Sequence, residues 1–163
     1  MKDQFYWESL LDVVNCSRSM NRVSKGIYAC PDTGGAYTHR RAKYFGAYED
    51  KAVSWLFEIK AVLFVRQDMS DSGVKWKNVD LGDEVLKEEV ADKIRRDSHL
   101  SAEIKIQDLQ VFLLDKPART NFYKSTKGGM LGSKQYFPGI AEGCRSSSEL
   151  AERLRNKRWS DFS

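Results

Sequence analysis

The segment from residue 43 to residue 65 constrains the fold most strongly. It reads KYFGAYEDKAVSWLFEIKAVLFV, in which two runs rich in β-branched and aromatic residues flank a polar break at residues 49–51. Such runs favour extended chain, and a short polar break between them favours a hairpin. Along the second run, alternate residues are all apolar, whereas the opposite face carries Glu58 and Lys60. The segment therefore predicts an antiparallel hairpin that packs on a core.

Three further segments have the apolar spacing or the capping residues of helices. Residues 4–15 predict a short amphipathic helix, and residues 83–97 predict a longer one with Asp83 as its N-cap. Ser146 and Glu149 have the spacing of a capping box, which predicts a helix immediately after them.

The order of these segments favours one α+β domain that spans residues 1–163. Short strands are expected at residues 26–30 and inside residues 104–114, ahead of Pro117, whereas residues 66–80 are expected to be a loop. Regular alternation of strands and helices is missing, which excludes a doubly wound parallel sheet. We expect a small, mostly antiparallel β-barrel or strongly curved sheet flanked by helices, with an N-terminal helix at about 4–15 and a basic C-terminal helix and tail at about 148–163.

Positive charge collects in the last third of the chain. The protein has 27 Lys and Arg residues against 23 Asp and Glu residues, a net charge of +4. Residues 116–163 hold ten of the bases and four acids, whereas residues 80–115 hold ten acids and five bases. Clustered basic residues are the electrostatic signature of a partner that carries phosphate groups. The distribution therefore favours nucleic acid as the partner.

The segment at residues 120–137 combines three kinds of residue that suit this partner. Its sequence, TNFYKSTKGGMLGSKQYF, contains three glycines, three lysines and four aromatic residues. Glycine-containing backbone can form an anion-binding nest, lysines supply positive charge, and aromatic rings stack on bases. We expect this segment to lie across the sheet from Arg40 and Arg41. Phosphate contacts are expected from Arg40, Arg41, Lys124, Lys127, Gly128, Gly129 and Lys134, and base stacking on Tyr37, Trp76 and Tyr123.

A second hypothesis is a metal-dependent nuclease. Glu58 and Lys60 form an E-x-K triplet that resembles the signature of the PD-(D/E)xK nuclease family, and Asp32 or Asp50 would supply the upstream acid. The resemblance implies two carboxylates on Mg²⁺ and a lysine that positions the attacking water. No convincing helix follows the triplet, as the family usually requires, and a cross-strand ion pair explains the same residues. We therefore favour binding without catalysis, with no cofactor unless the nuclease hypothesis holds.

Other classes of protein lack their sequence signatures. GGMLGSK does not have the Gly-Lys-Ser/Thr order of a phosphate-binding loop, and no nucleophile elbow or zinc-spaced Cys/His pair occurs. The three cysteines, Cys16, Cys30 and Cys144, are far apart, which is typical of reduced thiols in the cytoplasm. The longest apolar run, residues 61–65, is far too short to span a membrane. We expect a cytoplasmic protein with no membrane partner.

The order of the strand-like segments resembles the PUA-like superfamily and its EVE, YTH and ASCH branches. The resemblance rests on GIYACPD, RRAKYFGAY, SWLFEIKAV, LQVFLLDKP and NFYKSTKGG, which span residues 26–137. It implies a small β-barrel that recognises RNA or a modified DNA base, with Trp55, Trp76 and Tyr37 as cage residues by type. It also implies a component of a bacterial or phage defence or anti-defence system.

A third hypothesis is a phage-type inhibitor that acts on a protein partner. The acidic helix expected at residues 83–97 would then mimic the charge of nucleic acid. An ordinary solvated helix face explains the same residues, so the nucleic-acid hypothesis is preferred.

Overall fold

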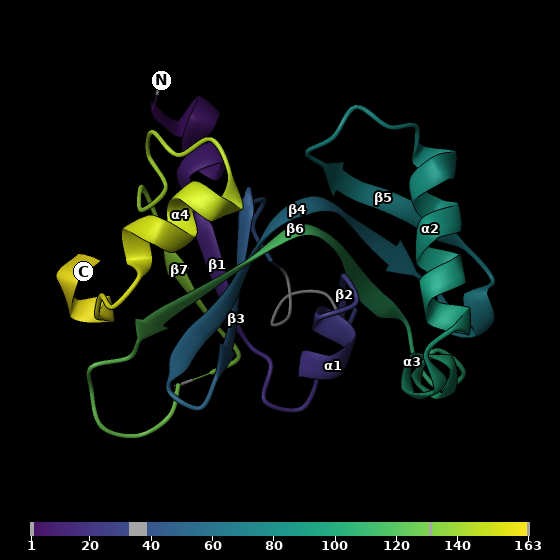
Figure 1. Ribbon diagram of the computed structural model, residues 1–163. Coiled ribbons are helices and arrows are strands. Elements are labelled where there is room, and N and C mark those ends of the chain that lie inside the picture. The colour runs from purple at the N-terminus through teal and green to yellow at the C-terminus, as the bar shows by residue number, and fades with distance from the viewer. Residues whose placement is uncertain (1, 33–38, 131, 163) are drawn as a thin grey trace. The chain divides into compact units, whose positions relative to one another are not determined.

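The computed structural model describes residues 2–32, 39–130 and 132–162 (Figure 1). Contacts between residues divide the chain into two compact units, and the long strands β4 (Ala52–Val65) and β6 (Leu109–Tyr123) contribute residues to both. That the chain forms a single PUA-like domain stays a prediction. Unit 1 contains Met1–Ser24, Arg41–Glu58 and Asp115–Ser163, and unit 2 contains Lys25–Arg40 and Ile59–Leu114.

Each unit combines strands with short helices. Besides its parts of β4 and β6, unit 1 contains the 3₁₀ helix η1 (Lys2–Ser9), β1 (Leu11–Asn15), α1 (Met20–Val23), β3 (Tyr44–Glu49), β7 (Lys134–Phe137), α4 (Ser147–Leu154) and η4 (Trp159–Phe162). Unit 2 adds β2 (Ile27–Pro31), η3 (Gln67–Met69), β5 (Ser72–Lys77), α2 (Asp83–Arg95) and α3 (Ser98–Glu103).

In unit 1, β1 lies between β3 and β7. It runs parallel to β3, with Leu11 opposite Tyr44, and antiparallel to β7, with Val14 opposite Lys134. β3 continues through a tight turn into the antiparallel β4. The apolar face of α4 packs against these strands. The core is formed by Leu11, Val13, Tyr44, Tyr48, Val53, Leu56, Phe122, Phe137, Ile140, Ala141, Leu150, Ala151 and Leu154.

In unit 2, β2 pairs with β6 and β5 pairs with β4, both antiparallel. The helices α2 and α3 cover one face of these strands, because Leu86, Val90 and Ile94 recur at helical spacing and bury one side of α2. The partners of these three residues in the core include Ala61, Leu63, Val65, Leu100, Leu109, Val111 and Leu113.

The α+β class and the strongly curved, mostly antiparallel sheet are confirmed. The hairpin of residues 43–65 is confirmed as β3 and β4, and a register shift in each of the β3–β4 and β4–β5 ladders marks a position where a bulge increases twist. The C-terminal helix is confirmed as α4. The Ser146 hydroxyl accepts a hydrogen bond from the Glu149 backbone N–H (3.2 Å), as the capping box predicts, whereas the Glu149 carboxylate accepts from the N–H of Arg145 (3.3 Å).

The helix predicted over residues 4–15 is wrong in its second half. Residues 11–15 form β1, and its first four residues are all buried, including the carboxylate-bearing Asp12. Both faces of β1 are buried, so its sequence lacks the alternation of polar and apolar residues that identifies a half-exposed strand. Apolar spacing in LLDVV therefore fitted a helix by chance.

Three other expectations differ from the structure. β5 lies inside the predicted loop at residues 66–80. β6 does not end at Pro117 but continues to Tyr123, and Lys116, immediately before the proline, has a φ of +51°. A positive φ beside a proline marks an irregularity that lets a strand continue. Asp83 is not the N-cap of α2, since Gly82 occupies that position and the Asp83 carboxylate pairs with Lys77 (3.0 Å).

Candidate nucleic-acid interface

Two backbone hydrogen bonds bring three distant segments to one edge of unit 1. The N–H of Lys124, just after β6, donates to the carbonyl of Lys51 in the β3–β4 turn (2.9 Å). The N–H of Tyr123 donates to the carbonyl of Lys157, after α4 (3.1 Å). In Figure 1 the β3–β4 turn and the loop between β6 and β7 lie at the same edge.

We call the basic side chains on these segments, together with Lys134 at the start of β7, the basic rim. Three acids, Glu49, Asp50 and Asp161, lie on the same segments, and Asp161 is 3.8 Å from Arg158. The basic rim therefore carries an excess of positive charge. Its six members are Lys51, Lys124, Lys127, Lys134, Lys157 and Arg158.

Lys124 organises the loop rather than presenting its charge outward. Its ammonium donates to the carbonyl oxygens of Lys127 and Gly128 (3.4 Å each) and to the hydroxyl of Thr126. Carbonyl groups thus converge on a cation here, whereas an anion-binding nest requires converging N–H groups. Gly128 has a φ of +78°, which explains the glycine, and a Cβ on Gly129 would meet no atom within 4 Å.

Aromatic side chains border the basic rim. Tyr123 is 38% exposed and Phe162 is 37% exposed, so both rings offer surface for stacking. The C-terminal η4 is held by Trp159, whose indole N–H donates to the carbonyl of Phe122 (3.2 Å) and whose ring packs 5.3 Å from that of Phe137. The ring of Phe162 packs against that of Phe122 with centroids 5.7 Å apart, so both aromatic residues of the tail are docked.

The predicted pairing of Arg41 with this loop does not occur. Arg41 precedes β3 and stacks on Trp7, with its guanidinium carbon 3.8 Å from the ring centroid. The basic rim lies beyond the opposite end of β3, past Tyr48, and the strand's six residues separate the two by about 20 Å. Arg40 is exposed and belongs to unit 2.

The described residues that were expected to contact bases belong to different units. Trp76 lies on β5 in unit 2, where its half-buried ring packs edge-on against Phe112 with centroids 6.3 Å apart. Trp55, in unit 1, has the guanidinium of Arg119 over its ring at 5.2 Å. Tyr37 lies outside the described residues.

The structure gives the carboxylates of the nuclease hypothesis other partners. Glu58 accepts a hydrogen bond from the backbone N–H of Ser147 (3.3 Å), and Asp50 lies in the turn at the far end of the β3–β4 hairpin. Asp32 pairs with Lys75 at 3.0 Å and with Arg66 at 3.5 Å. Lys60 pairs with Glu89 of α2 at 2.8 Å. Among the described residues, no group of three or more His, Cys, Asp or Glu side chains could hold a metal.

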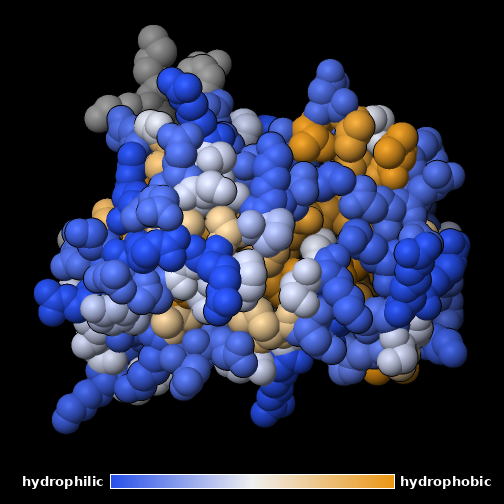
Figure 2. Space-filling model, viewed as in Figure 1, coloured by the Kyte–Doolittle hydropathy of each residue, from blue (hydrophilic) through white to orange (hydrophobic). Residues whose placement is uncertain are grey.

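The surface of α2 is a poor mimic of nucleic acid. Its acids have basic neighbours, including Lys87 at 3.3 Å from Glu84 and Arg96 at 3.3 Å from Asp92. Figure 2 shows an apolar area near the start of the helix, where Leu81 is 38% and Val85 is 52% exposed. This helix therefore lacks the continuous negative surface that the inhibitor hypothesis requires.

Sequence reasoning missed half of the basic rim. Lys157 and Arg158 lie in the basic last third, so the charge distribution alone could have indicated them. Lys51 carried no such signal, because only the pairing of β6 with the turn after β3 places it beside Lys124.

No protein-family model matches the sequence, and no curated protein or solved structure matches the chain. No helix among the described residues is long and apolar enough to cross a membrane.

Proposed function

We propose that this protein is a cytoplasmic nucleic-acid-binding module whose basic rim contacts the phosphate backbone. The observation that supports this most directly is the convergence of three segments, remote in sequence, that place six basic residues on one edge of unit 1. Phosphate contacts by lysine and arginine supply affinity for any sequence. Lys127 and Lys157 are exposed and would make such contacts, while Lys124 holds the loop that carries them.

The exposed ring of Tyr123 favours single strands over duplex. A base can stack on an aromatic ring only when it is free of its own helix, and each such stack contributes about 1–3 kcal/mol. Because Tyr123 adjoins Lys124 and Lys157, a strand whose phosphates follow the lysines would pass its bases over this ring. Recognition of a modified base, which the PUA-like resemblance implies, would add specificity to this contact.

Fluorescence anisotropy with labelled single-stranded DNA and RNA, measured across a salt series, tests the proposal. Affinity should fall as salt rises, and Lys127→Glu or Lys157→Glu should weaken binding about fivefold at about 0.1 M salt for each lost phosphate contact. Arg145→Glu is the matched control, since this exposed residue precedes α4 beside Cys144, at the other end of β3. Binding independent of salt, or equal loss in Arg145→Glu and Lys127→Glu, would contradict the proposal.

A further inference from the structure

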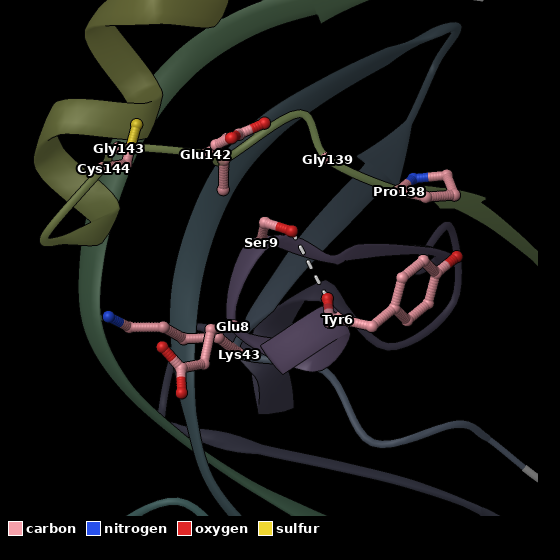
Figure 3. Close-up of a pocket in the computed structure, with 10 residues that line it drawn as sticks. Tyr6, Glu8, Ser9, Lys43, Pro138, Gly139, Glu142, Gly143 and Cys144 are labelled. Carbon is pink, nitrogen blue, oxygen red and sulfur yellow. Dashed lines mark hydrogen bonds between the residues drawn. The ribbon is translucent and has the colours of Figure 1, made fainter. Parts of the chain in front are cut away.

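Unit 1 contains a pocket at the end of β1 and β3 opposite the basic rim (Figure 3). Its volume is about 530 Å³, within the range of small-molecule sites. Three parts of the chain form its walls: the end of η1, Lys43 before β3, and the loop at residues 138–144 that follows β7.

The loop that forms one wall is braced by hydrogen bonds. The Arg153 guanidinium donates to the carbonyl oxygens of Ile140 (2.9 Å) and Glu142 (2.7 Å). The Ala141 N–H donates to the carbonyl of Ser9 in the opposite wall (3.1 Å). The pocket is therefore preformed, so a ligand need not supply the free energy to order it.

Charged groups of both signs line the pocket together with apolar groups. Figure 3 shows Lys43 and Glu8 at one end, Glu142 on the facing wall, and the ring of Tyr6 with Pro138 at the other end. Lys43 is partly buried, with its ammonium 5.4 Å from the centroid of the Tyr44 ring. A ligand that matches this lining carries an anionic group, a cationic group and an apolar body.

We propose that this pocket binds a zwitterion of the amino-acid type, either a free amino acid or the ends of a short peptide. Lys43 would bind the ligand carboxylate and Glu142 its ammonium group, while its apolar side chain contacts Tyr6 and Pro138. Cys144 serves only as wall, because burial raises the pKa of its thiol and keeps it neutral. This inference does not depend on nucleic-acid binding, since the basic rim lies at the other end of β3.

Titration of the ¹⁵N-labelled protein, followed by amide NMR shifts, tests the ligand class. The probes are leucine, leucyl-leucine, N-acetyl-leucine without the ammonium, and leucinamide without the carboxylate. We expect shifts at Ser9, Gly139 and Gly143, with leucine or leucyl-leucine binding about tenfold more tightly than either blocked probe. If leucine binds more tightly than leucyl-leucine, the natural ligand is a free amino acid. If leucyl-leucine binds more tightly, the natural ligand is a short peptide.

Two variants assign the charged contacts. Lys43→Gln should reduce the affinity for leucine to that for leucinamide, while leaving leucinamide binding and the anisotropy affinity for single-stranded DNA unchanged. Glu142→Gln should reduce the affinity for leucine to that for N-acetyl-leucine, while leaving N-acetyl-leucine binding unchanged. The proposal is wrong if neither leucine nor leucyl-leucine causes shifts up to about 10 mM, a ceiling for weak binding. It is also wrong if leucinamide binds as tightly as leucine.

Discussion

Glu58 joins β4 to the start of α4, and its replacement should destabilise unit 1. Its side chain is 17% exposed, one carboxylate oxygen accepts from the Ser147 N–H at 3.3 Å, and the other lies 3.8 Å from the Lys116 ammonium. Ser147 is the first residue of α4, so the carboxylate faces the positive end of the helix dipole. We therefore expect Glu58→Gln, which keeps the shape and removes the charge, to lower the free energy of unfolding.

The expected loss follows from these two contacts. The interaction of a partly buried carboxylate with a helix N-terminus contributes about 0.5–1 kcal/mol. Exchanging a charge-assisted hydrogen bond for a neutral one costs about another 0.5–1 kcal/mol. Lys116 is 65% exposed, so its ion pair adds little. Glu58→Gln should thus lose about 1–2 kcal/mol, which lowers Tm by about 3–6 °C.

Urea unfolding followed by circular dichroism measures this loss. The matched control is Glu152→Gln, a change at an exposed residue of α4 that pairs with Arg155 at 2.9 Å and should cost less than about 0.5 kcal/mol. Because Glu58 is a structural residue here, Mg²⁺ should leave the Tm of the wild type unchanged. The reasoning fails if Glu58→Gln is as stable as Glu152→Gln, or if Mg²⁺ stabilises the wild type and not Glu58→Gln.

Three further predictions concern the core, a helix cap and a buried thiol. Phe122→Ala should cost about 3–5 kcal/mol in urea unfolding, because this ring is fully buried in the core, whereas Phe162→Ala should cost much less. Ser146→Ala should cost about 1 kcal/mol by the same assay, since it removes the N-cap of α4, and a neutral effect would refute the capping role. Burial raises the pKa of Cys16 from 9.0 to about 12, so the thiol binds its proton more tightly in the folded chain. Stability present below pH 9 should be lost as pH rises toward 12, by up to about 1.4 kcal/mol per pH unit, and Cys16→Ala should show a shallower loss in pH-dependent unfolding.

Local patterns were sufficient where an element has one buried face and one exposed face. The apolar stripe predicted for α2 and the cap of α4 depend on neighbouring residues along the chain. Both are present in the structure, except that Val85, which was expected in the stripe with Leu86, Val90 and Ile94, is exposed. Patterns failed for β1, which is buried on both faces, and for β5, which mixes polar and apolar residues that are half-buried except for the exposed Lys75. Both strands exist because distant strands pair with them, and that information is not local.

The sequence by itself determined the α+β class, the β3–β4 hairpin and the accumulation of basic residues in the last third of the chain. Tertiary structure decided which charges meet. It joined Lys51 to Lys124 and Lys157 through backbone hydrogen bonds, and it placed Arg41 at the opposite end of β3. It also engaged Glu58 with α4, so a motif that resembles a nuclease signature stabilises the fold. The physical reason is that charge and periodicity are properties of the chain, whereas a binding surface depends on strand register and on contacts between distant segments.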